Sequence, residues 1–324
     1  MLRRHLLAAP ALLLGAGAAQ AQGAFPTRPI RFVVPWPAGG ATSNIARIVG
    51  DAMTPLLGQP VIFDNRSGAG GSLGAENVAK SPADGYTILM AGAGAFYRPL
   101  IDRDTPFNPD RDFGFVGLIG DGPFALAVRP GLPSDLPGFI AYAKANPGKL
   151  NMVSSGIGST SHLAGEMFNR TAGIEVTHVP YRGSSQAMVD LVAGRVDFYF
   201  DALSAVVEHY NAQRLNLIGL TTTARVPQMP QLATIAELGV GTSLANFSAA
   251  PWWGVCSPAN MPAPVLEKLS SALGAALAQP AVVQGVGEQG CTVGFLPPVP
   301  FAAFVRAENT KWSAVIEAAG LRVT

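Results

Sequence analysis

Strand-like and helix-like segments alternate along most of this chain, and the alternation is the feature that most restricts its fold. The apolar run at residues 29–36 predicts a strand. The next segment, residues 43–57, carries Ile45, Ile48 and Met53 at helical spacing. Further strand patterns lie at 60–65 and 86–92, with a helical pattern through residues 75–80 between them. Such alternation predicts a parallel α/β sheet with helices on its faces.

A second set of alternating segments begins near Phe124. Strand patterns lie at 125–130, 150–156, 174–180, 195–202 and 215–222, with helical patterns between most of them. The rest of the chain is too short for a third domain, so we expect it to return to the first. About 300 residues usually form two domains. The prediction is one lobe of residues 22–122 and 247–324, a second of residues 123–246, and a ligand cleft between them. Two hinge crossings, near 117–124 and 246–253, would join the lobes.

The first 21 residues have the features of a secretory signal peptide. Arg3 and Arg4 precede an apolar run from Leu6 to about Ala19, and residues 19–21 read Ala-Gln-Ala, an A-x-A cleavage site. The run is shorter than the roughly 20 apolar residues of a membrane span. We expect cleavage near Ala21 and a soluble periplasmic protein, exported by the general secretory or the twin-arginine route.

The charge balance argues against a nucleic-acid partner. Removing Arg3 and Arg4 lowers the 22 basic residues by two against 21 acidic residues, so the net charge becomes about −1. The sequence contains no polybasic run. With only 13% charged residues, we expect charged ligands to be held mostly by groups other than salt bridges.

The chain has 2 cysteines, Cys256 and Cys291. In an oxidising compartment they could form a disulfide, and two buried free thiols are the alternative. Neither has a Cys or His partner at metal-ligand spacing. We therefore expect no metal site and no cofactor.

Two glycine-rich turns share one layout. VVPWPAGGATSN at 33–44 and NMVSSGIGSTSH at 151–162 each join an apolar strand, a turn with hydroxyl side chains and a helix. The first is neither a nucleotide loop nor a dinucleotide turn, because it lacks Gly-Lys-Ser/Thr and three spaced glycines. Turns after parallel strands lie where ligands bind, and helix N-termini favour anions. The pair predicts a two-sided clamp for a carboxylate. Alternatively, Thr42, Ser43, Thr160 and Ser161 only cap their helices.

The sequence resembles the periplasmic solute receptors of tripartite tricarboxylate transporters, the Bug-type receptors, across nearly the whole mature chain. The matching stretches are RPIRFVVPWPAGGATSNIAR, FDNRSGAGGSLGAENVAKSPADGYTILMAG, SSGIGSTSHLAGEMF, THVPYRGSSQAMVDLVAGRVDFYFDAL and PQLATIAELG. The resemblance implies an α/β type II periplasmic-binding-protein fold that holds a small carboxylated solute between its lobes. It also implies membrane transporter subunits as partners, and we expect a monomer.

Carried onto this sequence, the resemblance implies two clamps, at 38–43 and 155–162. The ligand-binding residues would be Trp36, Ala38, Gly39, Gly40, Ala41, Thr42, Ser43, Gly94, Arg98, Ser155, Gly156, Gly158, Ser159, Thr160, His162, Tyr181, Arg182 and Asp201. The family often has an aspartate at the position of Ser43 and an asparagine at that of Arg98. Both departures favour an acidic ligand.

Several of these residues have a second interpretation. Asp201 would accept a hydrogen bond from the ligand or cap the helix that begins near Leu203. Arg182 would form a carboxylate fork or an exposed ion pair. His162 is expected to pack or donate to a loop carbonyl rather than catalyse.

Two alternative functions remain open. GGSLG at 70–74 satisfies G-x-S-x-G, so an exported serine hydrolase using Ser72 is a minor alternative. Residues 65–71, however, separate Ser72 from the preceding strand, unlike in a nucleophile elbow. The other alternative is a periplasmic ligand sensor for a membrane kinase, which would have the same fold.

Overall fold

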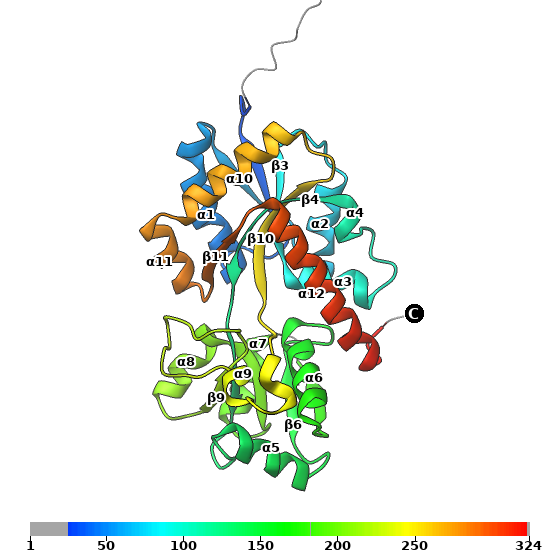
Figure 1. The fold of residues 1–324 in the computed structure, drawn as a ribbon, viewed down its shortest axis with the longest axis vertical. Helices are drawn as coiled ribbons and strands as arrows, with labels where there is room; N and C mark the ends of the chain where they lie inside the picture. Colours follow the sequence, from blue (N-terminus) through cyan, green and yellow to red (C-terminus); the bar gives the residue numbers. More distant parts are fainter. Residues whose placement is uncertain (1–24, 182, 323–324) are drawn as a thin grey trace, which may run out of the picture.

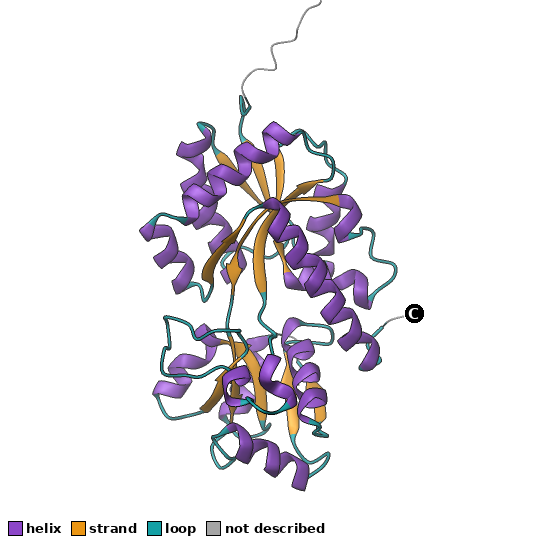
Figure 2. Cartoon of the chain, viewed as in Figure 1, coloured by secondary structure: helices purple, strands orange, loops and turns teal. Residues whose placement is uncertain are grey.

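The computed structural model describes residues 25–181 and 183–322, and the proposed signal peptide lies outside them. The chain forms two lobes, each built on one sheet (Figures 1 and 2). The sheet of the first lobe has the order β11-β4-β10-β3-β1-β2, and that of the second has the order β7-β6-β8-β5-β9. The first comprises β1 (Ile30–Val34), β2 (Val61–Asn65), β3 (Thr87–Gly92), β4 (Phe113–Asp121), β10 (Trp252–Pro258) and β11 (Thr292–Leu296); the second comprises β5 (Phe124–Val128), β6 (Asn151–Ser154), β7 (Thr177–Pro180), β8 (Phe198–Ala202) and β9 (Asn216–Leu220).

Helices cover both sheets (Figure 2). Those of the first lobe are α1 (Ala41–Leu57), α2 (Ser72–Ala79), α3 (Ala93–Ile101), α4 (Pro109–Asp112), α10 (Ala263–Leu277), α11 (Pro280–Glu288) and α12 (Pro298–Ala318), with the 3-10 turn η1 (Ala69–Gly71). Those of the second are α5 (Leu136–Ala145), α6 (Thr160–Ala172), α7 (Ser184–Val192), α8 (Leu203–Asn211), α9 (Ile235–Leu238) and the 3-10 turn η2 (Ser243–Asn246). No single helix in these ranges is long and apolar enough to cross a membrane, although the bent pair α10 and α11 meets the length and composition criteria together.

The central strands are buried on both faces, which explains their continuous apolar sequences. Phe32 and Val34 of β1 pack into one core cluster, whereas Val33 points into the cluster on the other face. All six residues of β3 are buried. Helix α1 covers one of these faces with Ile45, Val49 and Met53, as the sequence predicts.

Both sheets are mixed, so the prediction of parallel sheets is only partly correct. β1 runs parallel to β2 and β3, and β6 runs parallel to β7 and β8. β10 is antiparallel to β3 and β4, and β5 is antiparallel to β8 and β9. The exceptions are β5 and β10, which lie next to the crossings, and β11, which is antiparallel to β4 at the edge of the first sheet. A chain that leaves one lobe and later returns traverses the sheets in the opposite sense, which accounts for β5 and β10.

The two crossings lie side by side (Figure 1). The outgoing one is Gly122–Pro123 between β4 and β5, and the returning one is 247–251 between η2 and β10. The Gly122 N–H donates to the Pro251 carbonyl at 2.8 Å. A Cβ on Gly122 would lie 2.6 Å from the Trp253 ring, so glycine is required for this close approach. The outgoing crossing is shorter than the predicted 117–124 because Gly117 still belongs to β4.

The last helix reaches from the first lobe to the second. Trp312 of α12 is fully buried, and its Nε1 donates to Glu308 Oε2 at 2.9 Å. Tyr97 of α3 donates to the same oxygen at 2.8 Å and accepts from Trp252 Nε1 at 3.0 Å. Near the end of α12, Arg170 of α6 donates to the Ala318 carbonyl at 2.8 Å. Besides the two crossings, α12 is thus a further connection between the lobes.

The proposed disulfide is wrong in this structure. Cys256 and Cys291 are both buried free thiols. Cys256 lies on β10 and Cys291 just before β11, and β4 separates these two strands in the sheet. The thiols also belong to different core clusters. The alternative of two buried free cysteines is the one that the structure supports.

Candidate ligand site between the lobes

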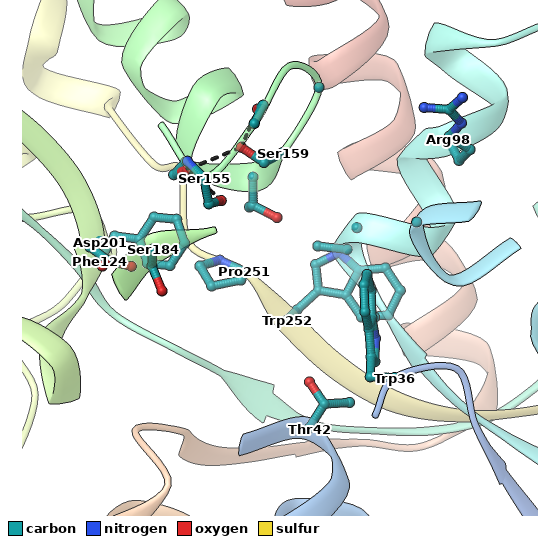
Figure 3. Close-up of a pocket in the computed structure, with 18 of the residues that line it drawn as sticks. Trp36, Thr42, Arg98, Phe124, Ser155, Ser159, Ser184, Asp201, Pro251 and Trp252 are labelled. Carbon is teal, nitrogen blue, oxygen red and sulfur yellow. Dashed lines mark hydrogen bonds between the residues drawn. The ribbon is translucent and has the colours of Figure 1, made fainter. Parts of the chain in front are cut away.

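A cavity of about 440 Å³ lies between the lobes (Figure 3). Its walls come from the turns that follow β1, β3, β6 and β8, from the start of α7 and from the returning crossing. The lining residues are Trp36, Thr42, Gly70, Gly92, Ala93, Gly94, Arg98, Ile101, Phe124, Ser155, Gly156, Ile157, Gly158, Ser159, Thr160, Ser161, Ser184, Asp201, Pro251, Trp252 and Trp253.

Four helices begin at this cavity. α1, α3, α6 and α7 each contribute residues of their first turn to its wall, namely Thr42, Ala93 with Gly94, Thr160 with Ser161, and Ser184. The first N–H groups of a helix have no partner within the helix, and the N-terminus carries the positive end of its dipole. The cavity therefore has the electrostatics of an anion site although it contains few cationic side chains.

The first-lobe wall is held by indole and amide groups. Trp253 Nε1 donates to Thr42 Oγ1 at 2.9 Å, and Asn65 Nδ2 donates to the Trp36 carbonyl at 2.9 Å. A Cβ on Gly94 would lie 3.4 Å from the Trp36 ring. Of the predicted first-lobe residues, Trp36, Thr42, Gly94 and Arg98 line the cavity. Ala38, Gly39, Gly40 and Ala41 lie on an exposed turn outside the lining, and Ser43 is buried against Asn65.

The second-lobe turn is ordered by its own hydroxyl groups. Ser161 Oγ lies 3.0 Å from the hydroxyls of both Ser155 and Ser159, and it accepts from the Ser155 N–H at 3.0 Å. Gly156 and Gly158 have φ values of +138° and +75°, which side chains rarely tolerate. The predicted residues Ser155, Gly156, Gly158, Ser159 and Thr160 all line the cavity.

The alternative interpretation, that the hydroxyl groups of four residues only cap helices, is wrong; these residues are Thr42, Ser43, Thr160 and Ser161. α1 begins after Gly40 with no side-chain cap, so Thr42 and Ser43 are not caps. The cap of α6 is Ser159, which accepts from the His162 N–H, and not Thr160 or Ser161. Thr42, Thr160 and Ser161 instead line the cavity.

A pair of histidines supports the second-lobe turn from behind. His162 is buried, lies outside the lining, and accepts the Gly158 N–H on Nδ1 at 3.1 Å. Of the two predicted roles, packing is confirmed by this burial, whereas the hydrogen bond differs from the predicted one, because His162 accepts from a loop amide and does not donate to a loop carbonyl. Its ring stacks on His178 at 3.8 Å, and His178 Nε2 lies 2.7 Å from Ser154 Oγ. Glu166 Oε1 is 3.6 Å from His162 Nε2.

This arrangement predicts a pH-dependent stability. Burial, followed by the neighbouring His162, lowers the pKa of His178 from 6.5 to about 4. The unfolded chain then binds more protons at this group between these values, so the contribution of His178 to the free energy of unfolding should decrease as the pH falls from 6.5 towards 4. Asp201, whose pKa is raised to about 7, has the opposite effect over the same range, so the prediction concerns a difference between two proteins. From pH 7.0 to 6.0 and 5.0 the melting temperature of the wild type should fall relative to that of His178→Gln. An equal change in both proteins would contradict this role. The window above pH 5 limits interference from Glu166, whose lowered pKa acts below 4.5.

Asp201 lies at the carboxyl end of β8, where Figure 3 shows it beside Phe124 and Ser184. Its side chain is 93% buried, since the exposed fraction is 7%. Oδ1 accepts from the Ala202 N–H at 2.9 Å, whereas Oδ2 has no hydrogen-bond partner among the described residues. Burial raises its pKa to about 7, against the effects of the Ala202 N–H and the nearby Tyr199 hydroxyl. The N-cap interpretation is wrong, because α8 begins after Ala202 with no side-chain cap.

Of the predicted ligand contacts Arg98 and Tyr181, only Arg98 lines the cavity. Arg98 donates to Asp102, the residue that follows the end of α3, at 2.7 Å. Tyr181 lies outside the lining and donates to Asp190 at 2.6 Å. Arg182 lies outside the described residues. Tyr181 is therefore a structural contact of α7 in this conformation.

Several wall residues were not predicted because they come from distant segments of the chain. Trp252 and Trp253, at the start of β10, both line the cavity, and Trp252 is also fully buried in the core. Other wall residues that were not predicted as ligand contacts are Gly70, Gly92, Ala93, Ile101, Phe124, Ile157, Ser161, Ser184 and Pro251. The clearest sequence signal was the start of a third helix directly after β3, at AGAG in residues 91–94.

Ser72 lies outside the cavity lining. It is the first residue of α2, it is 5% exposed, and its Oγ has no hydrogen-bond partner among the described residues. A nucleophilic serine requires an adjacent base. The described residues also contain no group of three or more His, Cys, Asp or Glu side chains that could hold a metal ion.

Comparisons with known proteins agree on one family. The profile of the tripartite tricarboxylate transporter family receptor, TctC, matches residues 45–321. Protein BugT of Bordetella pertussis is 34% identical over 305 residues, which cover 92% of this chain and 91% of that protein. The structure of R. palustris Rpa4515 with adipate is 33% identical, with a TM-score of 0.75 and coverage of 91% of this chain and 98% of that one. MatC from Rhodopseudomonas palustris with bound malate is 31% identical, with a TM-score of 0.73 and coverage of 90% and 100%.

Proposed function

This chain belongs to the TctC family of tripartite tricarboxylate transporter receptors, and we propose that it captures a small di- or tricarboxylate, or a related organic acid, between its lobes and delivers it to a membrane transporter. Its place of action would be the periplasm, and its partners would be the membrane subunits of a tripartite tricarboxylate-type transporter. We propose a monomeric receptor that needs no cofactor and leaves its ligand chemically unchanged.

The convergence of four helix N-termini on one cavity carries this proposal. Each N-terminus favours a carboxylate by roughly 0.3 to 1 kcal/mol, and by up to about 2 when partly buried. Thr42, Ser155 and Ser184 add hydroxyl groups to the same wall. The relatives are consistent with this chemistry, since one holds adipate and another holds malate.

Capture would occur by closure of the lobes. We propose that residues 22–122 with 247–324 move as one unit and residues 123–246 as the other. The hinge would lie at Gly122–Pro123 and at 247–251, where only two chain segments pass between the sheets. Closure would exclude water and strengthen the hydrogen bonds to the carboxylate. The contact of α12 with α6 would then shift or break.

The position of Ser72 favours a receptor function over a serine-hydrolase function. Its hydroxyl is buried away from the cavity and has no base beside it among the described residues. Ser72 is also absent from the lining of the cavity where a substrate would bind.

A thermal-shift screen tests the proposed ligand class. The screen would contain di- and tricarboxylates, hydroxy acids, aromatic carboxylates, acidic amino acids and uncharged sugars. A ligand at about 100 times its dissociation constant should stabilise the protein by roughly 2.7 kcal/mol. We expect the hits to be carboxylates. Hits confined to uncharged sugars would contradict the proposal.

A further inference from the structure

The buried carboxyl group of Asp201 lies in the wall of a cavity whose other features attract anions. Its Oδ2 atom meets no donor at hydrogen-bond distance among the described residues. The buried Tyr199 hydroxyl, which is also without a partner at that distance, lies near enough to lower the pKa of Asp201. Buried polar atoms are nearly always hydrogen-bonded, so an unpaired oxygen in a cavity wall points to a partner that arrives with the ligand. An ionised Asp201 and a ligand carboxylate would, however, repel each other.

Among residues 25–181 and 183–322, no cationic side chain is paired with Asp201 to remove that repulsion. Its neighbour across the sheet on β5 is Ala125. A second cavity of about 450 Å³, between α7 and α8, shares Asp201 and Ser184 with the first. The titratable or cationic side chains that line the two cavities are Arg98, His209 and Arg214, besides Asp201 itself. None of the three forms an ion pair with Asp201 among the described residues, and Arg98 is paired with Asp102.

Two carboxyl groups in one poorly solvated site cannot both remain ionised without a large cost, so one of them takes up a proton. We propose that this receptor binds a proton together with its carboxylate ligand, and that Asp201 Oδ2 is the atom that receives it. The proton comes from solvent, forms an O–H bond on Oδ2, and is then donated as a hydrogen bond to a carboxylate oxygen of the ligand. The inference rests on the proposed function, because it requires a carboxylate in the cavity.

The pKa of Asp201 in the free protein sets the pH range over which proton uptake is expected. Because the pKa of Asp201 in the free protein is about 7, the group is mostly ionised at pH 8 and must gain nearly one proton on binding. At pH 6 it is already mostly protonated, and little uptake is expected. Above about pH 7.5 the affinity for a fully ionised ligand should fall about tenfold per pH unit, until the pKa of the complex is reached.

Titration calorimetry in two buffers of different ionisation enthalpy, phosphate and Tris, measures this uptake. The probe is whichever of adipate, malate, succinate and citrate gives the largest thermal shift. At pH 8.0 we expect uptake close to one proton per ligand in the wild type and none in Asp201→Asn. The neutral amide of the variant donates without needing a proton, so the variant should bind about tenfold more tightly than the wild type at pH 8.0. His209→Gln, which changes another titratable side chain in the wall of the second cavity, should leave the uptake unchanged.

The outcomes separate this inference from the proposed function. Equal binding enthalpies in the two buffers, or weaker binding by Asp201→Asn at pH 8.0, would show that Asp201 remains ionised and accepts a donor from the ligand. Loss of the uptake in His209→Gln would assign the proton to another group. Each of these results overturns the inference while leaving a carboxylate receptor intact. Failure of all four probes to bind would contradict the proposed function as well.

Discussion

Gly94→Val is expected to weaken carboxylate binding on the order of 100-fold while the protein remains folded. Gly94 is the second residue of α3, and it lines the cavity. A Cβ at this position would meet only the Trp36 ring, at an ordinary distance of 3.4 Å, so the backbone can accept it. The two methyl groups of valine would then occupy the space where a ligand approaches the N–H groups of α3.

The matched control is Gly294→Val on β11. A Cβ there would have no atom within 4 Å, and Gly294 lies outside the cavity lining. Calorimetry with the best carboxylate should show wild-type affinity for this control, and circular dichroism should show that both variants are folded. Wild-type affinity in Gly94→Val would exclude the α3 N-terminus from the site. Gly156→Val is a poorer probe, because the φ value of +138° would strain any side chain.

Trp252→Ala is expected to cause a large loss of stability, about 3 to 5 kcal/mol. The ring is fully buried and meets Phe96, Phe301 and Phe304 edge to face. Its Nε1 also donates to Tyr97, which joins β10 to α3 and, through Glu308, to α12. The melting temperature should fall by roughly 10 °C.

Trp252→Phe provides the comparison. It keeps most of the aromatic packing and removes only the Nε1 hydrogen bond, so the loss should be about 1 kcal/mol beyond any repacking. Thermal denaturation of the two variants at pH 7 measures the difference. Equal destabilisation would show that the hydrogen bond dominates over the packing, contrary to this account.

The sequence predicted the two-lobe α/β fold well because apolar periodicity and turn residues are local signals. The stripe of α1 and the continuous apolar run of β3 both appear in the structure as predicted. Strand direction was harder, since whether β10 runs parallel or antiparallel depends on how the chain returns between the lobes. Residues 117–121 show the same limit: they belong to β4, although they were predicted as part of a crossing.

The candidate site was predicted best where one turn forms a wall by itself. Ser155, Gly156 and Gly158 come from one such turn, and all of them line the cavity. Prediction failed where the wall joins distant segments, as with Trp253, which donates to Thr42 across 211 positions of sequence. Prediction also failed for residues 38–41. They share the glycine-rich pattern, but the sequence does not show that they are exposed outside the cavity. The sequence could not decide whether Cys256 and Cys291 form a disulfide, because the answer depends on whether another strand separates β10 from β11 in the sheet.

The central claim is that a carboxylate occupies the cavity between the lobes, and native mass spectrometry of the protein purified from its own periplasm tests it most directly. We predict one organic acid of low mass per chain, present in the wild type and in Gly294→Val and absent from Gly94→Val. A retained uncharged sugar, or a carboxylate retained equally by Gly94→Val, would contradict the account.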